Sequence, residues 1–148
     1  EKNEFSQNEG LNMYIETQFC FNSEIVLNWE RSIRADGNKL PIHIGIPGPA
    51  TIKTLFRFAQ LVGIGNSMNF LTKQARNVTK LLTIQSPDSL LSELSLGMQS
   101  DSDCLIESFH FYPFGGFAKT VAYIESIMAG NISIHRNDGV DVKERLVG

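Results

Sequence analysis

Polar side chains that could bind or protonate a ligand lie in two segments of this sequence that are predicted to be β-strands. Gln18 lies in the segment Leu11–Phe21, and His110 and Tyr112 lie in the segment Leu105–Tyr112. An amide pairs with the donors and acceptors of a ligand amide or heterocycle, whereas an imidazole can also transfer a proton. We expect these side chains to line a ligand pocket. The alternatives are a satisfied buried amide for Gln18 and a structural hydrogen bond for His110.

Other residues with chemical potential carry weaker patterns. His43 and His110 have no third ligand at a metal spacing, so we expect no metal site. Cys20 has no base pattern around it and is expected to fill space as a small apolar side chain. Glu16 on an enclosed face would be unfavourable without a partner, so it is either paired or functional. No residue is assigned a catalytic role from these patterns.

Two glycine-containing turns allow two interpretations each. The turn Gly45–Pro49 either lets a ligand approach the backbone closely or is a tight strand-to-helix connection. Gly115 and Gly116 precede a predicted helix, where an anion could bind, but no phosphate-binding spacing accompanies them.

The elements that position these residues are strands alternating with helices. Period-two alternation predicts strands at Leu11–Phe21, Pro41–Ile46 and Leu105–Tyr112. In the first strand, Met13, Ile15, Phe19 and Phe21 should share one face, with Tyr14, Glu16, Gln18 and Cys20 on the other. In the third, Phe109 and Phe111 should lie opposite Ser108, His110 and Tyr112.

Helical spacing predicts an apolar stripe on each of the intervening helices. Asn22 or Ser23 should cap the first, and Pro49 should stand in the first turn of the second. Ser86 should cap the third ahead of Pro87. The predicted stripes are Ile25, Val26, Trp29 and Ile33; Ile52, Leu55, Phe56 and Ala59; Leu90, Leu91, Leu94 and Met98; and Phe117, Val121, Ile124 and Met128. One or two short helices are expected over residues 66–85, with Lys73, Arg76 and Lys80 in solvent.

This order predicts an α/β fold of about three consecutive parallel βα units. One polar face on three neighbouring parallel strands is typical of the inside of a (β/α)8 barrel, whose sites lie at the carboxyl ends of the strands. A complete barrel needs roughly 250 residues, and this chain has 148. We therefore expect a partial barrel that is a portion of a longer protein or that associates with itself or a partner.

Composition excludes several classes of protein. Hydrophobic residues make up 42% and charged residues 20%, as in a globular domain, so disorder is not expected. The net charge of -3 argues against nucleic-acid binding, and no apolar run is long enough for a membrane span. Two distant cysteines are too few for a disulfide scaffold, which favours the cytoplasm. The sequence opens with Glu1 in what resembles the end of a helix, as expected of a processed chain or a piece of a longer one.

Three strings in register resemble the methylenetetrahydrofolate reductase family. Residues 17–22 read TQFCFN and resemble the family's TQFFFD strand. Residues 45–49 read GIPGP and resemble its GI-x-P turn, and residues 109–112 read FHFY, as in its FHFY strand. The resemblance covers about residues 1–130, as the carboxy-terminal part of the catalytic barrel, and leaves 131–148 as a polar tail.

The resemblance implies a flavoenzyme of one-carbon metabolism and methionine biosynthesis. In that family FAD passes a hydride from NADH or NADPH to methylenetetrahydrofolate, giving methyltetrahydrofolate. Gln18 resembles the glutamine that binds the pterin of the folate. Ile52 stands where the family has an aromatic residue that packs on the folate, and residues 113–116, PFGG, replace a segment containing an arginine that meets the folate tail.

These departures imply a divergent branch, for example one serving a folate-linked demethylation pathway. The family's general acid and most FAD contacts come from earlier strands, so the isolated chain is expected to be inactive. Two alternatives remain open: a half-barrel that binds folate or assembles without its own catalysis, and a different barrel enzyme whose motifs match by chance.

Overall fold

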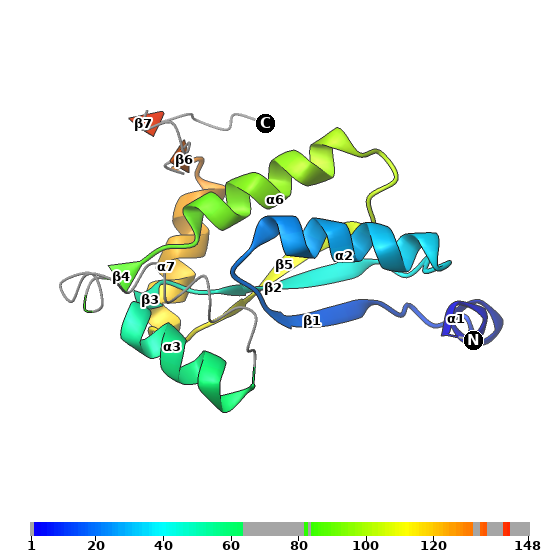
Figure 1. Ribbon diagram of the computed structural model, residues 1–148, viewed down its shortest axis with the longest axis horizontal. Helices are drawn as coiled ribbons and strands as arrows, with labels where there is room; N and C mark the ends of the chain where they lie inside the picture. The colour runs from blue at the N-terminus through cyan, green and yellow to red at the C-terminus, as the bar shows by residue number, and fades with distance from the viewer. Residues whose placement is uncertain (1, 64–81, 83, 132–133, 136–140, 143–148) are drawn as a thin grey trace.

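A computed structural model describes residues 2–63, 82, 84–131, 134–135 and 141–142 of the chain (Figure 1). The expected short helices over 66–85, with Lys73, Arg76 and Lys80, fall almost wholly outside these residues. The helices are α1 (Lys2–Glu9), α2 (Ser23–Ala35), α3 (Ile52–Leu61), α6 (Asp88–Ser100) and α7 (Phe117–Met128). The strands are β1 (Ile15–Phe19), β2 (Ile42–Pro47), β3 (Ala50–Thr51), β4 (Ile84–Gln85), β5 (Ile106–Tyr112), β6 (Ile134–His135) and β7 (Asp141–Val142).

The central feature is a parallel sheet of three strands in the order β1-β2-β5. The α/β class and the parallel strands predicted from the sequence are confirmed. Within the described residues the sheet is open and does not close into a barrel. The strands β3 and β4, and β6 and β7, form two small antiparallel pairs that the sequence did not predict.

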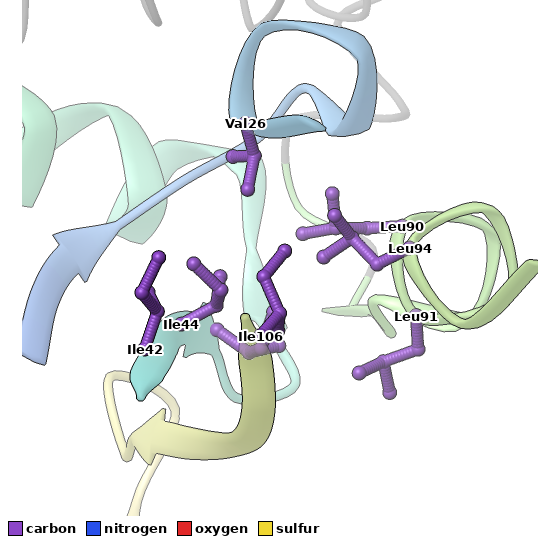
Figure 2. Close-up of a cluster of buried hydrophobic side chains, with 8 residues drawn as sticks. Val26, Ile42, Ile44, Leu90, Leu91, Leu94 and Ile106 are labelled. Carbon is purple, nitrogen blue, oxygen red and sulfur yellow. The ribbon is translucent and has the colours of Figure 1, made fainter. Parts of the chain in front are cut away.

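One face of the sheet is covered by α2 and α6, which lie side by side along it (Figure 1). Ile42, Ile44 and Ile46 alternate along β2 and point into this layer, where each is almost completely buried. Figure 2 shows most of the resulting cluster, in which the helices contribute Val26, Leu90, Leu91 and Leu94, and β5 contributes Ile106. Because these side chains leave water together, this layer is the main hydrophobic source of stability for the sheet.

Helix α2 begins as predicted, but its apolar stripe is only partly confirmed. The Asn22 side chain accepts a hydrogen bond from the Ile25 backbone N–H at 2.9 Å, which confirms the cap. The predicted stripe is wrong for Ile25 and Trp29, whose side chains are 57% and 36% exposed. It is confirmed for Val26, which is buried, and for Ile33, which packs against the core, while the buried Glu30 was not predicted.

Helices α6 and α7 also differ in part from expectation. Leu90, Leu91 and Leu94 are buried as predicted. The cap position is Pro87, not Ser86, whose hydroxyl instead donates to the Asp88 carboxylate at 2.5 Å. In α7 the predicted stripe is wrong at both ends, since Phe117 and Met128 are exposed while Thr120, Tyr123 and Ile127 face the protein.

Helix α3 begins later than predicted and lies beyond the carboxyl ends of the strands (Figure 1). Ala50 and Thr51 pair with β4, so Pro49 precedes a short strand and does not open the helix. Thr51 caps the helix, its hydroxyl accepting from the Thr54 N–H at 3.2 Å. Its apolar face packs on a second cluster, formed by Phe19, Phe21, Ala50, Leu55 and Ala59 with four partly buried aromatic side chains around them. The predicted stripe Ile52, Leu55, Phe56 and Ala59 is confirmed.

Candidate functional site

Strand β1 carries an irregularity that changes which residues share a face. The register with β2 shifts between Glu16 and Phe19. Ile15 and Cys20 pack against the cluster under α2 and α6, whereas Phe19 belongs to the aromatic cluster of Tyr112 and Phe114. The expectation that Phe19 lies on the same face of β1 as Ile15, and Cys20 on the same face as Glu16, is therefore wrong. A bulge adds a residue to one strand and reverses the alternation beyond it.

The bulge places the Thr17 carbonyl within reach of two side chains from β5. His110 Nε2 lies 3.0 Å from this oxygen, and the Tyr112 hydroxyl donates to it at 3.4 Å. On β2, the register partner of His110 is Gly45 and that of Tyr112 is Pro47. The Gly45 N–H in turn donates to the Thr17 hydroxyl at 2.9 Å, which holds the bulge against β2.

A carboxylate lies beside this pair of side chains. The Glu16 Oε1 atom is 3.8 Å from His110 Nδ1, so Glu16 is paired, as one of its two interpretations required. Burial, and secondarily the negative charge of Glu16, raise the pKa of the Tyr112 hydroxyl. Tyr112 therefore stays a neutral phenol over the physiological range, able to donate and accept hydrogen bonds.

Gln18 is next to the shared carbonyl and is exposed, so the interpretation as a satisfied buried amide is wrong. Its side-chain oxygen accepts a hydrogen bond from the Phe19 N–H at 3.2 Å. No partner is seen for its amide nitrogen among the residues that the structure describes. The Gln18 side chain is thus held through its oxygen atom, and its amide N–H groups remain available to a ligand.

Ile52 lies apart from the other three predicted site residues. Its side chain is only 2% exposed and lines a cavity of about 780 Å³ near the carboxyl ends of β1 and β2. Pro47, Gly48 and Leu55 share this lining, but Gln18, His110 and Tyr112 do not. The structure therefore brings His110 and Tyr112 together at the Thr17 carbonyl. Gln18 follows Thr17 in the chain, with its side chain bonded to the Phe19 N–H, and Ile52 lies apart from all three.

A second acid–imidazole pair occupies the same open face of the sheet. His43 Nε2 lies 3.6 Å from Glu107 Oε2, and the Tyr14 ring stacks on the His43 ring with centroids 4.1 Å apart. Glu16 is the register partner of His43, so the two pairs are neighbours on the sheet. Sequence reasoning missed Glu107 and the carbonyl of Thr17. The signal for the carbonyl was Gly45, since a glycine inside a strand often marks a bulge or a close backbone approach.

The glycine turns serve packing. A β-carbon at Gly48 would stand 2.5 Å from the Thr120 hydroxyl, and one at Gly115 would collide with the Pro49 carbonyl. The Gly116 N–H donates to the Pro113 carbonyl at 3.0 Å. These contacts favour the tight-connection interpretation of the Gly45–Pro49 turn. At Gly115–Gly116 the Gly116 N–H is already bonded to the protein, which argues against an anion site there.

The two thiols are kept protonated. Burial raises the pKa of the Cys20 thiol to about 12, and its sulfur donates to the Gly45 carbonyl at 3.4 Å. Burial also raises the pKa of Cys104. Because the thiolate is the nucleophilic form, Cys20 acts as a packed side chain, as expected.

Within the described part of the chain, no group of three or more His, Cys, Asp or Glu side chains is arranged to hold a metal ion. Of the helices that the structure describes, none has the length and apolar character needed to cross a membrane. No protein-family model matches the sequence.

Proposed function

We propose that this chain is the carboxy-terminal part of a (β/α)8-barrel flavoprotein similar to methylenetetrahydrofolate reductase. Three observations support the barrel: the three strands of the central sheet are parallel, they follow chain order across it, and α2 and α6 cover one of its faces. The other face carries polar side chains, as the inside of a barrel enzyme does near its carboxyl rim. The order of the three family-like strings along the chain supports the same assignment.

In the proposed reaction, FAD takes a hydride from NADH or NADPH and passes it to methylenetetrahydrofolate. The observation that carries the proposal is the meeting of the His110 and Tyr112 side chains at the carbonyl of Thr17, the residue that precedes Gln18. Gln18 would pair with the pterin through its amide nitrogen. His110 and Tyr112 would line the pocket, with Phe19 and Phe114 as its apolar wall. The proposal assigns no ligand contact to Ile52, because Ile52 lines the separate cavity.

The flavin would be held mainly by residues outside this chain. A diphosphate needs a cradle of backbone N–H groups or cationic side chains, and the Gly115–Gly116 turn is already occupied by protein carbonyls. We therefore expect the isolated chain to bind folate without retaining FAD. Stoichiometric flavin absorbance that survives gel filtration would contradict this part of the proposal.

Equilibrium dialysis with tritiated folic acid tests the folate site. We expect saturable binding that weakens roughly tenfold in Gln18→Ala, as loss of hydrogen bonds to a polar ligand predicts. The control is Gln99→Ala, which removes an exposed amide from α6 and should leave binding unchanged. Circular dichroism checks that both variants fold. Absence of saturable binding to the folded wild-type chain, or equal binding by Gln18→Ala, would overturn the proposal.

A second candidate function is a half-barrel that assembles and binds without its own catalysis. It is favoured by exposed apolar side chains on the helices at both edges of the sheet, Ile25 and Trp29 on α2 and Phe117 and Met128 on α7. An assembly that covered these side chains would remove their apolar surface from water. Light scattering distinguishes the candidates, because a stable monomer at high concentration would count against assembly.

A further inference from the structure

A cavity of about 780 Å³ lies between the first turns of α2 and α6 and the start of α3. Both α2 and α6 begin at the end of the sheet where the strands finish (Figure 1), and Pro47 and Gly48, from the end of β2, also line the cavity. Ligand pockets span roughly 300–1,000 Å³, and open α/β sheets bind ligands outside the carboxyl ends of their strands. The size and position of this cavity are therefore those of a ligand site. It is separate from the Thr17 carbonyl, because neither His110 nor Tyr112 lines it.

Buried apolar side chains form one wall of the cavity. Phe21, Ile52, Leu55 and Leu90 line it, and each is more than nine-tenths buried. They come from the end of β1, from α3 and from α6, so three separate elements hold the wall in place. A ring or hydrocarbon chain that packs against this wall leaves water, which favours binding of a molecule with an apolar body.

The charged side chains around the cavity are all of one sign. Glu24, Asp88 and Glu93 line it, and among its described lining residues there is no lysine, arginine or histidine. A helix N-terminus carries roughly +0.5 of an elementary charge. The two N-termini at the cavity therefore do not offset the three carboxylates. The resulting negative potential favours a cationic ligand and disfavours a phosphate or a carboxylate.

Hydroxyl groups orient two of these carboxylates. The Tyr123 hydroxyl donates to Asp88 Oδ1 at 2.6 Å, and the Ser86 hydroxyl donates to Oδ2 of the same side chain at 2.5 Å. The buried Ser23 hydroxyl donates to Glu93 Oε2. A neutral donor leaves the negative charge on the carboxylate, and each carboxylate oxygen can accept more than one hydrogen bond. Both side chains therefore keep the capacity to bind a cation.

We propose that this cavity binds a small organic cation, an amine carried on an aromatic or aliphatic body. The ammonium group lies near Glu24 and Glu93, and the body packs against the wall that includes Ile52 and Leu55. Within the described residues the carboxylates are not grouped to hold a metal ion, which favours an organic cation over a bare one. The proposal does not rest on the proposed folate site, since Gln18, like His110 and Tyr112, does not line the cavity.

Nitrogen-15 HSQC titration of the full chain with tryptamine, tryptophol and indole-3-acetate tests the site. The three probes share an indole body and carry an ammonium, a hydroxyl and a carboxylate group, respectively. We expect tryptamine to bind with a Kd of about 1 mM, roughly tenfold more tightly than indole-3-acetate. The amide signals of Ser23, Gly48 and Ser89 should shift, whereas those of Tyr14 and Glu107, near the amino ends of the strands, should not. Equal affinity for the three probes, absence of saturable tryptamine shifts, or shifts confined to other residues would overturn the proposal.

A bulky side chain at the cavity tests its location. Ser89 is exposed on the first turn of α6 and lines the cavity, so Ser89→Trp can fill the space without displacing a buried residue. We expect tryptamine binding to weaken at least fivefold, because the indole body loses its contacts with the apolar wall. The matched control is Ser100→Trp, at the exposed far end of the same helix, which should leave binding unchanged. Unchanged binding in folded Ser89→Trp would overturn the location.

Removal of negative charge tests the ligand class with little risk to folding. The double variant Glu24→Gln with Glu93→Gln keeps side-chain size at two exposed positions and keeps an acceptor for the Ser23 hydroxyl. We expect tryptamine to bind roughly threefold more weakly, as loss of two exposed ion pairs predicts, and tryptophol to bind as before. The control is Glu125→Gln, an exposed position on α7 outside the cavity. Equal loss for tryptamine and tryptophol, or no loss for tryptamine, would overturn the assignment of a cation.

Discussion

Gly45 lies against the backbone of Gln18: a β-carbon at Gly45 would stand 2.8 Å from both the carbonyl carbon and the carbonyl oxygen of Gln18. This close approach lets the bulge of β1 rest on β2. The bulge held there carries the Thr17 carbonyl, which lies 3.0 Å from His110 Nε2. The arrangement of the candidate site therefore depends on the absence of one side chain.

Gly45→Ala should destabilise the protein by about 1–3 kcal/mol, because the added methyl group meets backbone atoms that cannot move aside independently. Urea unfolding measures the change in the free energy of unfolding. Gly97→Ala is the matched control, since its methyl group meets the end of the flexible Leu27 side chain and alanine favours the interior of α6. Equal stability of the two variants would show that β1 does not approach β2 this closely.

Sequence patterns placed β2 and β5 within one residue at each end, but they made β1 too long, as Leu11–Phe21 in place of Ile15–Phe19, and did not reveal its bulge. The strand β2 was placed within one residue at each end, because alternating isoleucines and flanking prolines mark both its buried face and its limits. In β1 the apolar alternation is regular from Ile15 to Phe19, yet the bulge reverses the faces between them. The alternation of apolar and polar residues is a property of one strand alone. A bulge arises from the way that strand pairs with its neighbour, so the alternation does not reveal it.

The face of α2 was misjudged for a related reason. Of the predicted stripe, the helix buries Val26 but exposes Ile25 and Trp29, and it buries Glu30, which hydrophobicity did not favour. The burial of Glu30 requires Arg34 and the backbone of β5, which come together only in the folded chain. The grouping of His110 and Tyr112 was predictable, because both alternate on one strand. Their contact with the Thr17 carbonyl was not predictable, because the bulge determines where that carbonyl lies.

Glu30→Ala should lower the free energy of unfolding by roughly 3 kcal/mol. The Glu30 carboxylate is 1% exposed, lies 2.9 Å from Arg34 Nε, and accepts a hydrogen bond from the Leu105 N–H at 3.1 Å. Its removal leaves a backbone donor at the start of β5 without an acceptor. Glu24→Ala, at an exposed position in the first turn of the same helix, should cost less than about 1 kcal/mol. A similar loss in both variants would mean that Glu30 is not buried.

Acid should weaken the link between α2 and the end of α6. The hydrogen bond from Arg34 NH2 to Asp101 Oδ2, at 2.5 Å, lowers the pKa of Asp101. A lowered folded-state pKa means that this contribution is complete above the unfolded value of about 3.9 and is lost as the pH falls through the folded value. Chemical denaturation at a series of pH values should therefore show a shallower loss of stability below pH 4 in Asp101→Asn. If the free energy of unfolding fell identically below pH 4 in the wild type and in Asp101→Asn, the pairing of Asp101 with Arg34 would be contradicted.

Cys20 should resist thiol reagents in the folded protein. Its pKa of about 12 leaves very little thiolate at pH 8, so labelling by Ellman's reagent should be slow and should accelerate when urea exposes the thiol. Because the folded pKa lies above the unfolded value of about 8.5, burial of the neutral thiol stabilises the fold fully below pH 8.5, and this contribution is lost as the pH rises toward 12. The Cys104→Ser variant isolates the Cys20 reaction. Rapid stoichiometric labelling of that variant at pH 8 without denaturant would show that Cys20 is not packed beneath α2 and α6.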